Sequence, residues 1–321
     1  MYHAILVPLD GSTVSAQALP LACTIARQCS ARIRLAHVHV PPVDYYLDNV
    51  PVIDPELERE SRVQETAYLE KLRAQIASDT ECSVDIALLE GPITEALAQA
   101  VTASDTDLVV MTTHGRAGMA RMWLGSIADS LVRRLAVPIV LLRPQGMLAA
   151  PVRAYPPAQI LVALDGSPLA EQVLPHIMAM GNPLEAEYTL LQAVEPFMLP
   201  GYIHAAYPHQ VEDDATIWHR EQALEYLEHM AHRLRLEGLR VRTRVAIDRS
   251  TAAAILEDAR DHKVDLIAMA THGRGGLARL MIGSVAAKVL HRAECPVLLY
   301  RPPRVPEAKT TTSAEPAYAS G

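Results

Sequence analysis

The sequence predicts an α/β fold made of two tandem domains, each a doubly wound, Rossmann-like parallel sheet. Three observations support this fold class. Nearly continuous apolar runs of strand length alternate with segments of helical spacing, which is typical of parallel strands buried on both faces. The connections are long enough for the crossover helices that parallel strands require. The same order of elements, with the same glycine-rich segment, then occurs twice.

Two anchors give the period of this repeat. Asp10 matches Asp165 at a separation of 155 residues, and Gly115 matches Gly273 at a separation of 158. Solenoid repeats reach only about 50 residues, so a period this long indicates duplication of a whole domain.

The length of the chain agrees with a duplication, because 321 residues suit two domains of about 150 residues each. We place the first domain at 1–144 and the second at 158–302. The proline-containing segment 145–157 is the predicted linker. The tail 303–321 is small, polar and without period, and is predicted to be disordered.

The first half begins with a continuous apolar run, which predicts a strand. Small apolar residues at helical spacing come next and predict a helix. Pro41 and Pro42 end the next strand, and a loop rich in Tyr, Asp and Pro leads to a long charged helix. Gly91 and Pro92 mark the start of a shorter helix. The expected strands are 4–9, 33–40, 84–89, 108–111 and 138–142. Helices are expected at 56–76 and 92–101, besides one after the first strand and one that begins at Gly125 and Ser126.

The second half repeats this plan. The expected strands are 160–164, 188–194, 241–247, 266–269 and 296–299, with helices at 168–180, 215–236 and 251–260. The order in each half is therefore β-α-β-α-β-α-β-loop-α-β, which favours a doubly wound sheet.

Composition excludes several classes of function. The formal net charge is −8 and no long run of Lys and Arg occurs, so a nucleic-acid partner is not expected. One Phe and two Trp are too few for a base-stacking surface. The first apolar run is too short for a membrane span or a signal peptide, so we expect a cytoplasmic protein that does not enter a membrane.

Cysteine and histidine usage predicts no metal site. Four cysteines in this length do not form a disulfide framework, and no CxxC pair occurs. His37, His39, His176 and His229 are scattered along the chain, and no metal is assigned to them.

The predicted ligand site lies at the carboxyl ends of the strands, where the strand order of a doubly wound sheet reverses. In each half an Asp-Gly-Ser segment follows the first strand, and the glycine loop, 111–118 or 269–276, follows the fourth. Gly115 and Gly273 permit positive φ, which turns loop amides toward one point. After nine intervening residues, Gly-Ser begins a helix whose first amides face the same point.

This arrangement suits a phosphate. A helix N-terminus contributes roughly 0.3–2 kcal/mol, and each hydrogen bond to a charged oxygen on the order of 1.5–3 kcal/mol. Several such contacts with an apolar base pocket reach the roughly 8 kcal/mol of micromolar binding. Asp10 and Asp165 are placed to accept from ribose hydroxyls or to hold magnesium. Neither a P-loop motif nor Gly-x-Gly-x-x-Gly occurs in the right context.

With these motifs, both halves resemble the universal stress protein family, whose nucleotide-binding branch carries Gly-x2-Gly-x9-Gly-Ser/Thr. The resemblance covers residues 1–144 and 157–302 and implies ATP as the ligand, with magnesium left open. Carried over by motif, the first site consists of Pro8, Asp10, Val38, Met111, Thr112, His114, Gly115, Arg116, Gly125, Ser126 and Ile127. The second consists of Asp165, Val194, Met269, Ala270, His272, Gly273, Arg274, Gly283, Ser284 and Val285.

Two departures from the family pattern occur. Thr112 and Ala270 stand where the family has its first motif glycine. Ala163 stands where Pro8 stands in the first half.

The resemblance also implies how the halves associate. The last strands of family members commonly pair across a dimer, which covers an exposed apolar edge. With both copies on one chain, 138–142 and 296–299 are expected to pair as an intramolecular pseudo-dimer. Further association into a homodimer is left open.

The leading functional interpretation is an ATP-binding stress-response protein in which the nucleotide reports or stabilises a state. No catalytic residue is assigned. One alternative is slow ATP hydrolysis or phosphoryl transfer, for which only Asp10 and Asp165 offer carboxylates near the loop. Another is a nucleotide-free dimeric scaffold, which Thr112 and Ala270 slightly favour.

The two halves differ at the start of the helix after the glycine loop. Ser126 and Asp129 have the spacing of a capping box, whose carboxylate competes with a phosphate for the same amides. Ala287 and Lys288 in the second half remove that carboxylate and add a cation. We therefore hypothesise that the second site binds ATP more tightly at low salt.

Overall fold

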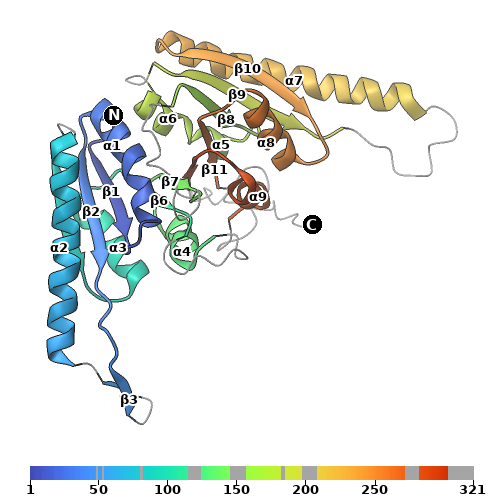
Figure 1. The fold of residues 1–321 in the computed structure, drawn as a ribbon. Helices are drawn as coiled ribbons and strands as arrows, with labels where there is room; N and C mark the ends of the chain where they lie inside the picture. Colours follow the sequence, from blue (N-terminus) through green and yellow to red (C-terminus); the bar gives the residue numbers. More distant parts are fainter. Residues whose placement is uncertain are drawn as a thin grey trace, which may run out of the picture.

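The computed structural model describes residues 1–47, 50–52, 54–79, 82–114, 124–144, 157–181, 185–196, 208–271 and 282–302. These residues form a ten-stranded sheet in the order β10-β9-β8-β11-β12-β7-β6-β1-β2-β5, with helices on both faces (Figure 1). All neighbouring strands are parallel except β7 and β12. The predicted α/β class with two doubly wound halves is confirmed.

The first half supplies five strands and its covering helices. The strands are β1 (Ala4–Leu9), β2 (Arg32–Val38), β5 (Val84–Leu89), β6 (Leu108–Thr112) and β7 (Ile139–Leu142). The helices are the 3₁₀ turn η1 (Ser15–Ala18), α1 (Leu19–Cys29), α2 (Pro55–Asp79), α3 (Ile93–Ala103) and α4 (Ser126–Arg134).

The second half repeats this arrangement. Its strands are β8 (Gln159–Ala163), β9 (Glu187–Val194), β10 (Arg240–Ile247), β11 (Leu266–Ala270) and β12 (Val297–Tyr300). Its helices are α5 (Pro168–Glu171), α6 (Leu174–Gly181), α7 (Pro208–Leu236), α8 (Thr251–Asp261) and α9 (Ser284–Arg292).

Two local expectations were wrong. The loop after β2 contains a small antiparallel hairpin of β3 (Tyr45–Leu47) and β4 (Val50–Val52), which projects away from the body (Figure 1). Its two strands have three residues each, too short to show an alternating pattern. The helix expected at 168–180 is divided into α5 and α6, because the backbone turns between Glu171 and Leu174.

Side chains alternate between two cores, one on each face of the sheet. Leu190 and Ile5 belong to the core under α1, α2, α6 and α7. Leu191 and Leu6 belong to the core under α3, α4, α8 and α9. Neighbouring residues of one strand thus point to opposite faces, as strand geometry requires. Both cores contain residues of both halves, so the chain folds as a single three-layer α/β/α body.

The two halves join through an antiparallel pair of strands at the middle of the sheet. Ile139, Val140 and Leu141 of β7 lie opposite Leu299, Leu298 and Val297 of β12. Val140 and Leu298 are equivalent positions of the repeat, 158 residues apart, so a pseudo-twofold axis passes near this pair. The pseudo-dimer expected from the sequence is therefore formed within the chain.

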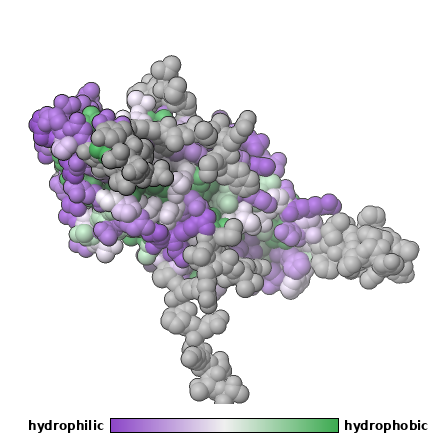
Figure 2. All heavy atoms as spheres, turned by 90° about the horizontal axis from the view of Figure 1, so that it is seen from below, coloured by the Kyte–Doolittle hydropathy of each residue, from purple (hydrophilic) through white to green (hydrophobic). Residues whose placement is uncertain are grey.

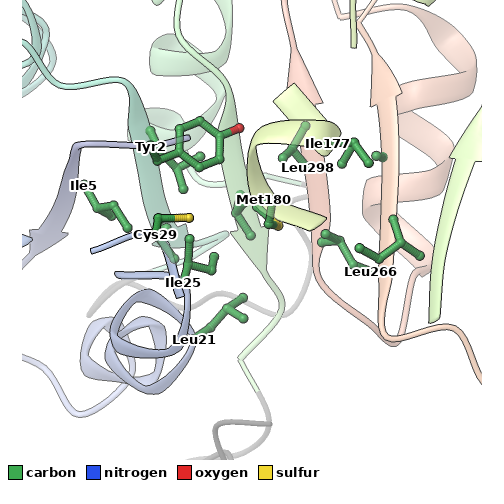
Figure 3. Close-up of a cluster of buried hydrophobic side chains, with 14 of the residues drawn as sticks. Tyr2, Ile5, Leu21, Ile25, Cys29, Ile177, Met180, Leu266 and Leu298 are labelled. Atoms are coloured by element: carbon green, nitrogen blue, oxygen red, sulfur yellow. The ribbon is translucent and has the colours of Figure 1, made fainter. Parts of the chain in front are cut away.

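Helices α1 and α6 pack beside this joint. Cys29 and Ile25 of α1 lie beside Met180 of α6, and Ile177 of α6 lies farther from α1, next to Leu298 (Figure 3). The hydroxyl of Tyr2 donates a hydrogen bond of 3.0 Å to the carbonyl of His176 across the two halves.

The outer surface is mixed in character. In the view of Figure 2, hydrophilic residues dominate the surface and smaller areas of hydrophobic residues lie between them. Within the described residues, every helix is too short or too polar to span a bilayer.

Candidate functional site

The strand order places one candidate ligand site in each half, at the carboxyl ends of the strands where the order reverses. We call each of these sites a mouth. From β1 the order runs outward through β2 and β5 on one side, and through β6 and β7 on the other. The reversal lies between β1 and β6, and its repeat lies between β8 and β11. Because β7 and β12 are antiparallel, the carboxyl ends of the two sets of strands face opposite edges of the sheet. The two mouths therefore open separately and do not share one ligand.

A cleft of about 1200 Å³ occupies the mouth of the second half. Ligand sites of small molecules commonly measure about 300–1,000 Å³, so this cleft has room for a nucleotide. It is lined by the ends of β8, β9 and β11, the start of α9, and one side of α7 and α8. We call it the second-half cleft. Its lining includes seven residues predicted from the sequence: Asp165, Val194, Met269, Ala270, Gly283, Ser284 and Val285.

Five predicted residues lie outside the described part of the chain. They are Gly115, Arg116, His272, Gly273 and Arg274. The binding roles assigned to them, and to the seven residues of the cleft, stay predictions.

The N-cap positions of α4 and α9 require glycine for steric reasons. The amide of Gly283 donates to the carbonyl oxygen of Thr271 at 3.0 Å, and a Cβ atom there would lie 2.6 Å from that oxygen. The amide of Gly125 likewise donates to Thr113 at 2.9 Å, and a Cβ atom would lie 2.8 Å from its oxygen. Both helices thus begin pressed against the end of the preceding strand. A valine at either glycine would disturb the fold itself, so such variants do not isolate binding.

The first amides of α9 face the cleft without a side-chain cap. The N-cap residue is Gly283, which has no side chain to cap the helix, and no side-chain cap hydrogen bond is formed within the described residues. Ser284, Val285 and Ala286 follow it and line the cleft. The first amides of a helix have no partner within the helix, so they are available to an anion.

The prediction of a capping box at the start of α4 is wrong. Gly125, not Ser126, is the N-cap residue of α4, so Ser126 lies one position too late to cap. The carboxylate of Asp129 instead accepts two hydrogen bonds from Arg133, at 2.8 and 2.9 Å. The charge of Asp129 is thereby paired, and it gives no ground for weaker anion binding in the first half.

Asp165 and Asp10 hold equivalent turns after the first strand of each half. The Oδ1 atom of Asp165 accepts from the amide of Ser167 at 3.0 Å and from its hydroxyl at 2.6 Å. The Oδ1 atom of Asp10 accepts from Ser12 at the same two distances. These hydrogen bonds orient each carboxylate at its mouth, which is the position expected for a group that contacts ribose.

The end of β6 carries the first departure from the family pattern. Thr112 is buried, and its hydroxyl donates to the carbonyl of His114 at 2.7 Å. The Nδ1 atom of His114 lies 3.0 Å from the hydroxyl of Thr113. Thr112 therefore folds back onto its own loop. Its counterpart Ala270 has no such group and lines the second-half cleft.

The structure brings together histidines that looked scattered in the sequence. Nδ1 of His39 lies 2.7 Å from Oε2 of Glu65, and Nε2 of His37 lies 3.5 Å from Oε1 of the same carboxylate. Nδ1 of His37 also donates to the carbonyl of Leu9 at 2.9 Å. Both histidines are buried at the carboxyl end of β2, and Glu65 reaches them from α2. We call these three residues the His–Glu cluster.

The charges of the second-half cleft do not by themselves attract a triphosphate. Its described lining contains the acidic residues Asp165 and Glu195, and no lysine or arginine. Backbone amides, a cation that accompanies the nucleotide, or Arg274 would have to balance the phosphate charge. Among the residues that the structure describes, no cluster of three or more His, Cys, Asp or Glu side chains is arranged to hold a metal.

Cys29 and Cys295 are poor nucleophiles because their thiols are buried. Burial raises the pKa of Cys29, and burial raises the pKa of Cys295 to about 11. Both thiols therefore stay protonated at neutral pH, which reduces their reactivity.

The sequence analysis missed one wall of the second-half cleft. Helix α7 contributes Trp218, His219, Gln222, Ala223 and Tyr226, and α8 contributes Thr251 and Ile255. The sequence does contain a signal that aligns α7 with α2. Tyr68-Leu69 of α2 and Tyr226-Leu227 of α7 are 158 residues apart, which is also the separation of the two glycine loops.

The family described as the universal stress protein family matches residues 1–143 and again 158–301. The chain belongs to the universal stress protein family. Both halves match it separately, so the chain is a tandem member, as the sequence predicted.

Individual relatives agree with this assignment. A universal stress protein of Mycobacterium tuberculosis is 28% identical over 308 residues, which cover 93% of this chain and 97% of that protein. The crystal structure of a universal stress protein from Archaeoglobus fulgidus superposes with a TM-score of 0.66 at 16% identity, covering 93% of this chain and 98% of that one. The second likeness supports the fold alone.

One further solved structure is described as a universal stress protein in complex with cAMP. The match covers 45% of this chain and 99% of that one, at 19% identity and a TM-score of 0.36. The bound nucleotide belongs to that protein.

Proposed function

We propose that this universal stress protein binds ATP in the second-half cleft and acts as a nucleotide-responsive regulatory factor in a stress response. The observation that carries the proposal is the uncapped start of α9, which opens into a cleft of about 1200 Å³ beside Asp165. An anion-binding helix end, a carboxylate and an apolar floor are thereby combined at one mouth.

Each part of the nucleotide has a matching surface in this proposal. The phosphates lie at the first amides of α9, next to Ser284. The ribose hydroxyls donate to Asp165, whose carboxylate is held at the mouth by Ser167. The base lies where the end of β9 meets the side of α7, beside Val194, Ala223 and Tyr226. Magnesium, if required, enters with the nucleotide.

Calorimetric titration of the full chain with ATP tests the proposal. We expect saturable binding in the micromolar range, which corresponds to roughly 8 kcal/mol. Parallel titrations with cAMP and with inorganic triphosphate show which parts of the nucleotide contribute. Absence of ATP binding, with and without magnesium, would refute the function and leave the scaffold interpretation.

A further inference from the structure

The second-half cleft extends beyond the residues predicted from the sequence. We call this extension, along one side of α7, the α7 lobe. It is bounded by Gln192, Val194, Trp218, Gln222, Ala223 and Tyr226, all of which line the cleft. Gln192 has the same strand parity as Leu190, a residue of the core under α7, so its side chain points to the α7 face of the sheet.

Gln192 carries an unsatisfied polar atom in this lobe. The residue is 7% exposed, and its Oε1 atom is buried with no hydrogen-bond partner among the residues that the structure describes. A buried acceptor left unpaired costs about 1–3 kcal/mol, so such atoms in native proteins call for a partner. Gln192 itself lines the cleft, so a rotation of its side-chain amide would bring Oε1 to a ligand that donates a hydrogen bond.

The ring of Tyr226 is fixed on the other side of the lobe. Its hydroxyl donates to Oε1 of Glu171 at 3.1 Å, which ties α7 to α5. Trp218 also lines the cleft and is 58% exposed. Two aromatic side chains and one amide acceptor make a wall suited to a planar ring that carries an N–H group.

In the first half, the positions equivalent to this wall carry the His–Glu cluster. Strand register pairs Pro8 with Ala36 and Ala163 with Leu191, so Ala36 corresponds to Leu191. The next residues, His37 and Gln192, are therefore equivalent.

The remaining members of the His–Glu cluster also have counterparts in the lobe. Two residues after His37 and Gln192, His39 corresponds to Val194. Glu65 and Ala223 each lie three residues before the matching Tyr-Leu pair of α2 and α7. All three residues of the cluster are thus replaced by Gln192, Val194 and Ala223, and all three replacements line the cleft.

We propose that the two halves differ in function: the α7 lobe makes the second half the nucleotide-binding half, and Gln192 selects a base with an exocyclic amino group. The inference rests on the proposed function and adds its base specificity and its restriction to one half. In the first half, the His–Glu cluster occupies the place that the base takes in the second.

The test compares ATP with purine riboside triphosphate, which lacks only the 6-amino group. The full chain is expected to bind one ATP, about tenfold more tightly than the analogue. The variant Gln192→Leu is expected to bind both nucleotides equally, with the affinity for ATP reduced by about tenfold. His37→Gln, the matched change in the first half, is expected to leave the affinity for ATP unaltered.

The outcomes separate this inference from the proposed function. If ATP binds but the full chain does not distinguish the two nucleotides, or Gln192→Leu keeps the preference, the role of Gln192 is refuted. Two equivalent ATP molecules per chain would refute the restriction to the second half. If neither nucleotide binds to the full chain, the proposed function fails and this inference fails with it. Circular dichroism of each variant checks that it is folded.

Discussion

Replacing Leu298 with aspartate is expected to unfold most of the protein. Leu298 is fully buried, pairs with Val140 at the joint between the halves, and belongs to the core that both halves share. Aspartate there would lose the packing of a buried leucine, worth about 2–5 kcal/mol, and would bury a carboxylate without a partner. Together these costs approach the free energy of unfolding of a typical native protein, about 5–15 kcal/mol.

Urea denaturation followed by circular dichroism measures this effect. Val63→Asp is the matched control, because Val63 is 59% exposed on α2 and its change should cost less than about 1 kcal/mol. A single cooperative loss of structure in both halves is expected for Leu298→Asp. Retention of wild-type stability would show that the strand pair β7–β12 does not hold the halves together.

The change Ser284→Glu is expected to abolish ATP binding without harming the fold. Ser284 is the first residue of α9, is exposed, and lines the second-half cleft. A glutamate there repels a phosphate from the helix N-terminus, where it also adds about 0.3–1 kcal/mol of helix stability. Loss of several charged hydrogen bonds, each on the order of 1.5–3 kcal/mol, lowers the affinity by at least about a hundredfold.

The first half supplies the control for this variant. Ser126 occupies the same position at the start of α4 and is also exposed. Ser126→Glu should leave calorimetric ATP binding unchanged if the second half holds the nucleotide. An ATP affinity that falls in Ser126→Glu but persists in Ser284→Glu would reverse the assignment of the halves.

The sequence was sufficient for the architecture because its signals are local and repeated. Strand β5 has the predicted bounds, since its flanking loops carry clear turn residues. The pairing of β7 with β12 was implied by the family resemblance, because both copies of the last strand lie on one chain. The hairpin of β3 and β4 was missed because its strands are shorter than the window in which alternation is visible.

The composition of the site was predictable only in part. The turns at Asp10 and Asp165 and the helix starts at Gly125 and Gly283 follow from motifs with fixed spacing. The α7 lobe joins residues that no motif links.

Gln192 and Ala223 illustrate why. They are separated by 31 residues and meet at the cleft only through the crossover from β9 to α7. The His–Glu cluster arises in the same way, because Glu65 reaches β2 from a helix whose register is set by tertiary packing. Contacts between residues so far apart in the sequence depend on how the helices pack across the sheet. Hydrophobic periodicity does not specify that packing.

Photolabelling with 8-azido-ATP, followed by mapping of the modified peptides, locates the bound base. If the base lies in the α7 lobe, the label is expected within 187–196 or 208–236, and excess ATP should prevent its attachment. Label protected by ATP in the equivalent segments of the first half, 32–39 and 55–79, would contradict binding of the base in the α7 lobe, as would the absence of any protected label.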